Sequence, residues 1–282
     1  GTLFLCKGAA FKEAYLKDAV NRGAVAYVSE KKYEAGKEIP ALIVNDARKA
    51  QFVLGEAFYD YPAKSLHVTA LTGTKEKTTT AYYLQSMLDA CLKKQGGNGC
   101  GLLSSIEYYD GKTREASTLT TPESLELCRH MRNAVDAGLS HMVMEVSSQG
   151  LMLHRTAGFT FDIGIFTHIE PDHIGPNEHT SFEHYLSCKK MLLRQCRIGI
   201  VNRDDEHYEK IIDGHTCSLE TYGFSPEADL RAVNPELLTK KGVLGISYDL
   251  QGLLNFPVEI DLPGKFSIYN SLTAIAICRH LN

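Results

Sequence analysis

The sequence predicts an α/β protein in which a mostly parallel sheet carries helices on both faces, preceded by a partial N-terminal α/β domain. Three observations support this fold class. Strand-like apolar runs alternate with helical stretches along most of the chain. These apolar runs contain few alternating polar residues, which is typical of strands buried on both faces. Polar motifs follow directly after several of the runs, where open α/β sheets bind their ligands.

Composition agrees with a globular protein and excludes several classes. The chain has 282 residues, of which 44% are hydrophobic, so it can form one large domain or two modest ones. Acidic residues outnumber basic ones by 34 to 30, which argues against a nucleic-acid partner. No apolar run approaches the roughly 18 residues that a membrane span needs. The eight cysteines form no CxxC pair, so we expect reduced thiols, a cytoplasmic location and no zinc or redox motif of that kind.

Residues 1–64 are expected to form the partial N-terminal domain. An amphipathic stretch at residues 11–22 predicts a helix, and residues 24–28 and 41–44 predict short strands. The turn-like residues 61–64 then suggest a linker, with the domain boundary near residue 64.

Residues 65–282 are expected to form the central domain. The strands predicted from apolar runs are residues 67–72, 141–146, 161–166 and 198–201. The predicted helices are residues 78–92, residues 122–137 with Pro122 in the first turn, and a last helix that begins near Phe266. After residue 216, alternating and turn-rich runs predict a small antiparallel section.

The first chemical motif is residues 72–80, between a predicted strand and a helix. Backbone N–H groups and the helix N-terminus attract an anion there, so Lys77 could reach outer phosphates and the Thr78 hydroxyl could bind Mg²⁺. The complete GxxxxGK[ST] pattern fails, because Leu71 and Glu76 stand at its glycine positions. On this pattern alone, a polar turn capped by threonines is the alternative.

Three further motifs lie at the end of a predicted strand or in the first turn of a predicted helix. Glu145 ends an apolar strand and is a candidate metal ligand or base, although a local cap or ion pair is the alternative. Residues 167–173, counted together with His179, combine carboxylates with imidazoles in a spacing that suits Mg²⁺ or Mn²⁺ better than zinc, although a satisfied polar loop is also compatible. Asn270, one turn into the last helix, could bind an adenine edge, but such segments usually only cap helices.

Together these motifs resemble the Mur ligases, in particular those that add the third peptide residue to a UDP-N-acetylmuramoyl dipeptide. Residues 1–30 resemble the later part of that family's UDP-binding domain, and the resemblance covers nearly the whole chain. The segments that carry it are residues 72–80, 119–123, 144–155, 167–173 and 185–189.

The resemblance implies a role for each matching residue. The expected ATP-binding residues are Gly73, Thr74, Lys75, Lys77, Thr78, Thr79 and, at the adenine, Asn270. The expected Mg²⁺ ligands are Thr78 and Glu145 for one ion, and His173 and a carbamylated Lys189 for a second. The residues expected to bind the UDP-sugar peptide are Thr120, Thr121, Ser147 and Arg155. Lys77, His173 and Lys189 are the expected catalytic residues.

The resemblance also implies a reaction. It is the ATP-dependent addition of L-lysine or meso-diaminopimelate to UDP-N-acetylmuramoyl-L-alanyl-D-glutamate, through an acyl phosphate, during peptidoglycan synthesis. We therefore expect ATP, Mg²⁺, the UDP-dipeptide and a free amino acid as ligands, no nucleic-acid or membrane partner, and a monomer.

Three departures from the family pattern leave alternatives open. Glu76 stands where the family has glycine, and His168 stands where it usually has asparagine. The third domain of the family would begin beyond Asn282, so we expect residues 1–282 alone not to complete ligation. One alternative is a nucleotide- or UDP-sugar-binding module with impaired catalysis, and another is a related ligase such as folylpolyglutamate synthase.

Overall fold

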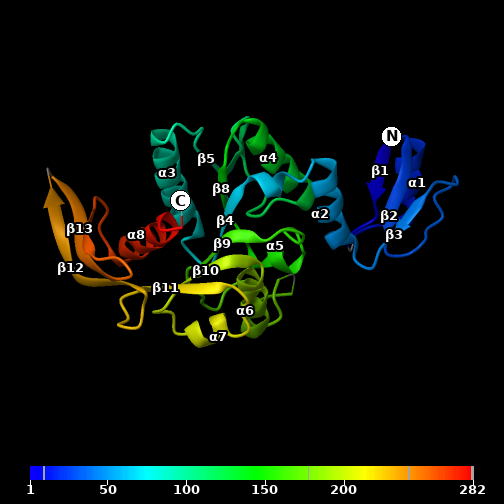
Figure 1. Ribbon diagram of the computed structural model, residues 1–282. Coiled ribbons are helices and arrows are strands. Elements are labelled where there is room, and N and C mark those ends of the chain that lie inside the picture. The colour runs from blue at the N-terminus through cyan, green and yellow to red at the C-terminus, as the bar shows by residue number, and fades with distance from the viewer. Residues whose placement is uncertain (9, 177, 241, 281–282) are drawn as a thin grey trace.

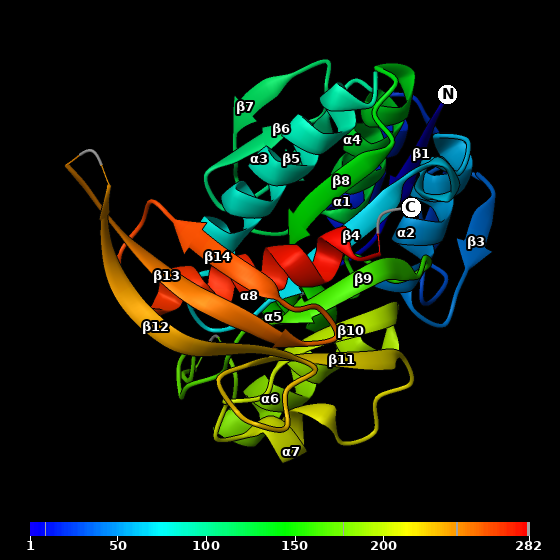
Figure 2. The same ribbon diagram turned by 60° about the vertical axis from the view of Figure 1, so that its left-hand side comes forward.

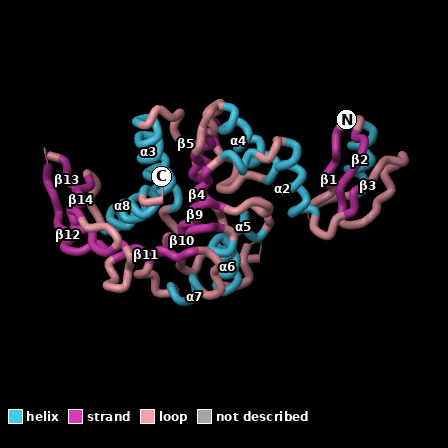
Figure 3. The backbone as a smooth tube through the Cα atoms, in the orientation of Figure 1, coloured by secondary structure: helices cyan, strands magenta, loops and turns pink. Residues whose placement is uncertain are grey.

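The computed structural model describes residues 1–8, 10–176, 178–240 and 242–280, which form two sheets (Figure 1). The smaller sheet is parallel and has the order β1-β2-β3. It consists of β1 (Thr2–Leu5), β2 (Ala24–Ser29) and β3 (Ala41–Ile43), with α1 (Glu13–Asn21) packed against β2. Figure 3 shows this sheet at one end of the molecule.

The larger sheet has the strand order β14-β13-β12-β11-β10-β9-β4-β8-β5-β6-β7, and neighbouring strands run parallel from β5 to β12. Its strands are β4 (His67–Thr72), β5 (Cys100–Leu103), β6 (Glu107–Tyr109), β7 (Arg114–Ala116), β8 (His141–Glu145), β9 (Phe161–Phe166), β10 (Cys196–Asn202), β11 (Ser218–Gly223), β12 (Leu230–Lys240), β13 (Val243–Gly252) and β14 (Phe256–Ile260).

The helices connect and cover these strands. They are α2 (Ala47–Phe58), α3 (Lys77–Lys94), α4 (Ser124–Asp136), α5 (Ser148–Met152), α6 (Phe182–Lys190), α7 (Tyr208–Ile212) and α8 (Lys265–Cys278), with short 3-10 helices η1 (Pro62–Ser65) and η2 (Met191–Arg194). Within the described residues, no helix combines the length and the apolar character that crossing a membrane requires.

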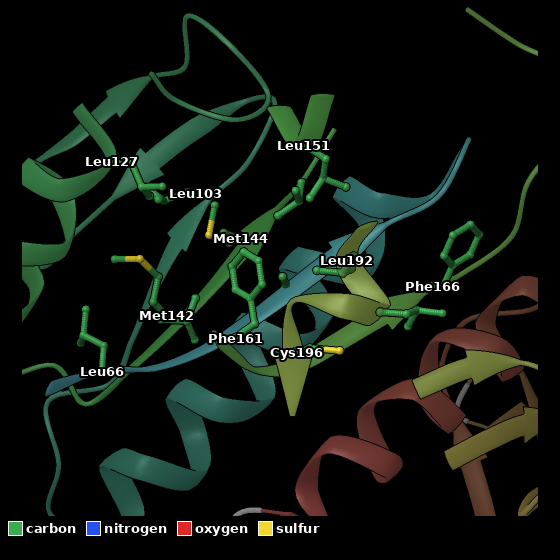
Figure 4. Packing of buried hydrophobic residues seen from close by; sticks show 14 of the residues in the cluster. Leu66, Leu103, Leu127, Met142, Met144, Leu151, Phe161, Phe166, Leu192 and Cys196 are labelled. Carbon is green, nitrogen blue, oxygen red and sulfur yellow. The ribbon is translucent and has the colours of Figure 1, made fainter. Parts of the chain in front are cut away.

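The central strands of the large sheet are buried on both faces, which confirms the predicted fold class. Along β8, Met142 and Met144 enter one core, while Val143 between them enters the other. Successive side chains of a strand point to opposite faces, so a run of apolar residues is what this position requires. Helices α4 and α6 contribute to the first core, part of which Figure 4 shows, and α3 and α8 contribute to the second.

The sequence located the central strands and helices well, with two corrections. Pro122 precedes the helix that was expected to contain it, because Glu123 is the N-cap and α4 begins at Ser124. After residue 216 the structure has the predicted antiparallel section, but not along the whole stretch. Its first strand, β11, pairs in parallel with β10, and only β12, β13 and β14 form an antiparallel extension of the same sheet, which curves beside α8 (Figure 2). The antiparallel strands β6 and β7 at the other edge were not predicted.

Helix α2 packs on the larger unit, although it lies before the predicted boundary. Phe52 is fully buried in the same core as α4, and a Cβ atom on Gly55 would meet Cys128 Sγ at 3.0 Å. The segment at residues 61–64 is also ordered, largely as η1, which packs against α4. We therefore propose that the division between the two units lies before α2 rather than near residue 64.

Candidate active site

The loops that follow β4 and β9 are tied together at the carboxyl edge of the sheet. Thr167 N donates to Thr72 O at 3.0 Å, and Thr74 N donates to His168 O at 2.9 Å. A Cβ atom on Gly73 would lie 2.0 Å from Thr167 Oγ1, so only glycine fits at this close approach. The strand order reverses at β4, which has β8 on one side and β9 on the other. Open α/β sheets bind ligands in such a crevice.

Glu76 forms the sharp turn from this loop into α3. Its backbone is left-handed, with φ of 65°, and Thr80 N donates to its carbonyl at 2.9 Å to start the helix. This conformation costs a residue with a Cβ atom about 1 kcal/mol and costs glycine little. Burial raises the pKa of the Glu76 carboxyl. The glycine that the family resemblance implies at this position would avoid both the conformational cost and the negative charge of Glu76.

The neighbouring Lys75 does not neutralise Glu76. Its Nζ instead pairs with Glu170 Oε2 at 2.9 Å, which links the β4 loop to the β9 loop. His168, in the β9 loop, is half-buried, and burial lowers the pKa of its imidazole. The carbonyl of His168 accepts from the β4 loop, so the backbone of this residue has a structural role whatever its side chain.

Two lysines converge on the carbonyl oxygen of Gly73. Lys77 Nζ donates to it at 2.9 Å, and Lys189 Nζ, which comes from α6, donates at 2.7 Å. Lys189 is almost fully buried, and its ammonium also lies 4.7 Å from the ring centre of Tyr185. Burial, followed by the charge of Lys77, holds the pKa of Lys189 well below its usual value. Burial lowers the pKa of Lys77 too, although Glu145 and Asp172 oppose that effect.

Thr78 and Glu145 are linked through Ser105, a residue that the motifs did not indicate. Ser105 N donates to Glu145 Oε1 at 3.0 Å, and Ser105 Oγ lies 2.8 Å from Thr78 Oγ1 and 3.4 Å from the same carboxylate oxygen. Glu145 itself is only 1% exposed. Ser105 follows the apolar run of β5, so recognising that strand would have placed it at the same sheet edge.

A cavity of about 190 Å³ brings several predicted residues together. The predicted residues that line it are Lys77, Thr120, Ser147, Arg155, His173 and Lys189. His173 is the most open of them, and its Nδ1 lies 3.2 Å from Glu178 Oε1. Its ring lies 5.8 Å from that of Tyr185, the aromatic residue beside Lys189. Thr78 and Glu145 do not line this cavity.

The side of the cavity formed by α5 is fixed by hydrogen bonds to Thr121. The buried Thr121 hydroxyl donates to Glu145 O at 3.2 Å and accepts from Ser147 N at 2.9 Å, so here it positions its neighbours. Arg155 Nη1 donates to Thr121 O at 3.1 Å. Arg155 Nε also lies 2.9 Å from Glu123 Oε1, an ion pair too bent to be a hydrogen bond.

Asn270 and Thr79 lie outside this cavity. Asn270 is buried on α8, and its Oδ1 accepts a hydrogen bond of 2.7 Å from Thr80 Oγ1, which joins α8 to α3. Thr79 is exposed on the first turn of α3. The structure therefore brings the phosphate-loop lysine and the residues around α5 and α6 to one cavity, with the Thr78 and Glu145 pair beyond its lining.

Comparisons with known proteins agree with this arrangement. Residues 71–278 match the family described as the Mur ligase middle domain. The chain is 47% identical over 220 residues to the UDP-N-acetylmuramyl-tripeptide synthetase of Lactobacillus acidophilus, a match that covers 77% of this chain and 41% of the relative. It is 39% identical over 280 residues to the UDP-N-acetylmuramoyl-L-alanyl-D-glutamate–L-lysine ligase of Streptococcus mutans serotype c, covering 99% of this chain and 55% of the relative.

A solved structure of a UDP-N-acetylmuramoyl-L-alanyl-D-glutamate–2,6-diaminopimelate ligase has the same fold. The superposition has a TM-score of 0.79 at 21% identity and covers 99% of this chain and 57% of that one. The chain therefore belongs to the Mur ligase family. The residues that match the family, 71–278, make up most of the larger unit. The chain spans about half the length of the relatives that it matches.

Proposed function

We propose that this chain provides the ATP-binding and UDP-dipeptide-binding sites of an ATP-dependent ligase. The ligase joins L-lysine or meso-diaminopimelate to UDP-N-acetylmuramoyl-L-alanyl-D-glutamate in peptidoglycan synthesis. The supporting observation is the single cavity that Lys77 of the phosphate loop shares with Arg155 and Ser147 from the α5 region. The relatives are named for L-lysine in one case and 2,6-diaminopimelate in another, so the amino acid stays open between these two.

In this proposal the loop between β4 and α3 holds the ATP phosphates. Lys77 already points its ammonium along the loop, at the carbonyls of Gly73 and Thr74. A phosphate would offer this ammonium a stronger, charge-assisted partner than a carbonyl oxygen. The N-terminus of α3 adds its partial positive charge at the same place. Asn270 would lie towards the adenine, on the helix that Thr80 ties to α3.

The donor atoms near Thr78 fit Mg²⁺. A hydroxyl and a carboxylate are hard oxygen ligands, which Mg²⁺ prefers, and Ser105 holds Thr78 and Glu145 by hydrogen bonds. A bound Mg²⁺ would supply positive charge that neutralises the phosphates. Ser105 would keep the buried carboxylate oriented before the ion binds, as residues behind metal ligands generally do.

Lys189 suits the carbamylation that the family resemblance implies. An amine must be neutral to add to CO₂, and burial together with the charge of Lys77 favours the neutral form of Lys189. Its nitrogen would bond to the carbon of CO₂ and release one proton, which leaves a carbamate anion. That change would place an anion beside the ammonium of Lys77, which contacts the same carbonyl of Gly73, and the two would attract each other. His173 and the carbamate would then be the ligands of a second Mg²⁺.

The protein's part in the reaction is positioning and charge neutralisation. The substrate carboxylate, held on the Arg155 and Ser147 side, would attack the γ-phosphorus of ATP and form an acyl phosphate with release of ADP. The amino group of the incoming amino acid would then displace phosphate and form the amide bond.

We place this reaction in the cytoplasm and assign it to a monomer. The free thiols of all eight cysteines agree with a reducing compartment.

A second candidate is a binding module with impaired catalysis. The left-handed Glu76 at the phosphate loop supports it, because the residue adds both strain and negative charge where ATP would bind. A folate-specific ligase is not favoured, because the relatives at 39% and 47% identity carry names of muramyl-peptide ligases.

Ligand-induced stabilisation tests the substrate class. UDP-N-acetylmuramoyl-L-alanyl-D-glutamate should raise the melting temperature of the chain, since a ligand that binds only the folded state stabilises it. Tetrahydrofolate at the same concentration should not. Arg155→Ala should remove this rise in melting temperature. Arg197→Ala should retain it, because Arg197 lies at the start of β10, away from the carboxyl edge of the sheet. A shift with the folate alone, or an equal shift in Arg155→Ala, would contradict the proposal.

A further inference from the structure

A group of nitrogen and sulfur ligands lies behind the cavity, in and just before α6. One ring nitrogen each from His179 and His184 and the Sγ of Cys188 all lie within 4.8 Å of one another. His184 and Cys188 are four residues apart on α6 and therefore share one face of the helix. His179 precedes the helix, and its ring centre lies 5.0 Å from that of His184.

His179 has an unsatisfied nitrogen, which is the strongest indication of a ligand. Its side chain is fully buried, and its Nε2 lies 2.8 Å from Ser148 Oγ, whereas its Nδ1 has no hydrogen-bond partner. Buried polar atoms without a partner are uncommon in folded proteins. If Nε2–H donates to Ser148, Nδ1 keeps a free lone pair that can bind a cation. This pattern, with one nitrogen on a metal and the other on a hydrogen-bond acceptor, is usual for metal-binding histidines.

The other two side chains can complete the set. His184 Nδ1 accepts from Thr180 N at 3.3 Å and lies 3.4 Å from Thr180 Oγ1. Binding a metal through Nε2 therefore requires the tautomer in which Nδ1–H donates to Thr180 Oγ1 in place of accepting from Thr180 N. Cys188 is buried on the same side of α6. Ligand atoms around a tetrahedral ion with bonds of about 2.0–2.3 Å lie roughly 3–4 Å apart, so closure needs side-chain movements of only about 1 Å.

A second group of three residues lies elsewhere, but its histidine has no free ring nitrogen. Glu115, Glu126 and His130 also lie close enough to hold an ion. However, His130 Nδ1 is 2.7 Å from Asp110 Oδ2, and its Nε2 is 3.2 Å from Arg129 Nη2. Both ring nitrogens of that histidine therefore have protein partners, unlike those of His179.

We propose that His179, His184 and Cys188 form a binding site for a transition-metal dication of the Zn²⁺ class. Two imidazoles and a thiolate suit Zn²⁺ and exclude Mg²⁺, which prefers oxygen ligands. The thiol of Cys188 gives up its proton to solvent when the metal binds. The site is separate from the Thr78 and Glu145 pair and does not depend on the proposed ligase activity. It adjoins the cavity through Ser148, which lines that cavity and bonds to His179.

Cobalt provides a direct spectroscopic test, because a thiolate bound to Co²⁺ gives a charge-transfer band that Mg²⁺ and histidine alone do not. The complete chain is titrated with Co²⁺ in excess Mg²⁺, and Zn²⁺ is then added as a competitor. We expect the band to saturate at a single ion per chain and to disappear when Zn²⁺ displaces Co²⁺.

Two ligand variants and two matched controls locate the site. Cys188→Ser should abolish the band, and His184→Gln should weaken Zn²⁺ affinity by more than about tenfold. Cys91→Ser and His215→Gln change an exposed cysteine and an exposed histidine elsewhere, and both should bind as the parent chain does.

The half-exposed His184 gives a variant that should fold even if removing the buried Cys188 prevents folding. Absence of the band in the parent chain would overturn the proposal. So would a band that survives Cys188→Ser or disappears with Cys91→Ser, or an unchanged Zn²⁺ affinity in folded His184→Gln.

Discussion

At the scale of single residues, the phosphate loop combines attractive and repulsive charges within a few residues. Lys77 and Lys189 both donate to the carbonyl of Gly73, which concentrates positive charge beside the loop. Glu76, half-buried at the start of α3, adds a negative charge to the same loop sequence. A phosphate about 4 Å from that carboxylate would meet a repulsion on the order of 4 kcal/mol at an effective dielectric near 20.

The affinity for Mg²⁺–ATP should respond to Glu76. We predict that Glu76→Gly binds Mg²⁺–ATP at least about tenfold more tightly than the parent chain, a gain of about 1.4 kcal/mol. Glycine removes the charge and also adopts the left-handed backbone without a penalty. Calorimetric titration at one fixed Mg²⁺ concentration measures the effect, and Lys77→Ala in the Glu76→Gly chain should abolish the gain. Equal affinity in the two chains would show that Glu76 does not impair the site.

At the scale of elements, small residues in two strands allow η2 to approach the sheet closely. Gly164 of β9 is paired with Gly199 of β10 in the strand register. A Cβ atom on Gly164 would lie 2.7 Å from Cys196 Sγ and 3.1 Å from Leu192 Cγ, so no side chain fits there. Because η2 continues directly from α6, this close packing also fixes the end of the helix that carries Lys189.

The stability of Gly164→Ala tests this packing. The added methyl group should lower the free energy of unfolding by about 1–3 kcal/mol, as overpacking of a filled core generally does. Combining it with Cys196→Ala should recover part of the loss, with a coupling between the two sites of at least about 0.5 kcal/mol. Denaturant unfolding of the four chains measures the cycle. Gly175→Ala is the control, because a Cβ atom on Gly175 would approach Glu178 Oε2 only to 4.0 Å. An undestabilised Gly164→Ala chain would contradict the account of η2.

At the scale of the whole molecule, an ion-pair network joins the N-terminal sheet to the cavity. Lys7, just after β1, pairs with Glu123, and Glu123 also pairs with Arg155, which lines the cavity. A ligand that spans from the smaller unit to the cavity would pass this network. The position suits a UDP-linked peptide whose nucleotide end is held by the N-terminal domain, as the family resemblance implies.

The sequence predicted the central sheet well, because a strand buried on both faces must be apolar throughout. Residues 67–72 and 161–166 were located without error for that reason. It could not show that β12–β14 extend the same sheet, because alternation reveals a half-buried strand but not its neighbour. Residue spacing missed Ser105, whose contact with Glu145 joins distant segments. The sequence indicated His179 as a possible metal-binding residue, but it did not group His179 with His184 and Cys188, because that grouping depends on the path of the loop before α6.

One calorimetric comparison decides whether Lys77 and its loop bind the phosphates of ATP. Mg²⁺–ATP is titrated into the parent chain, Lys77→Ala and Lys94→Ala. The two lysines lie at opposite ends of α3. Both substitutions remove one positive charge and place an alanine in the same helix, so they differ only in position. We expect measurable binding by the parent chain and unchanged binding by Lys94→Ala. Lys77→Ala should bind at least about tenfold more weakly, because it loses a charge-assisted contact of roughly 1.5–3 kcal/mol. Equal affinity in Lys77→Ala and the parent chain, or no binding by the parent chain, would contradict the proposed phosphate site.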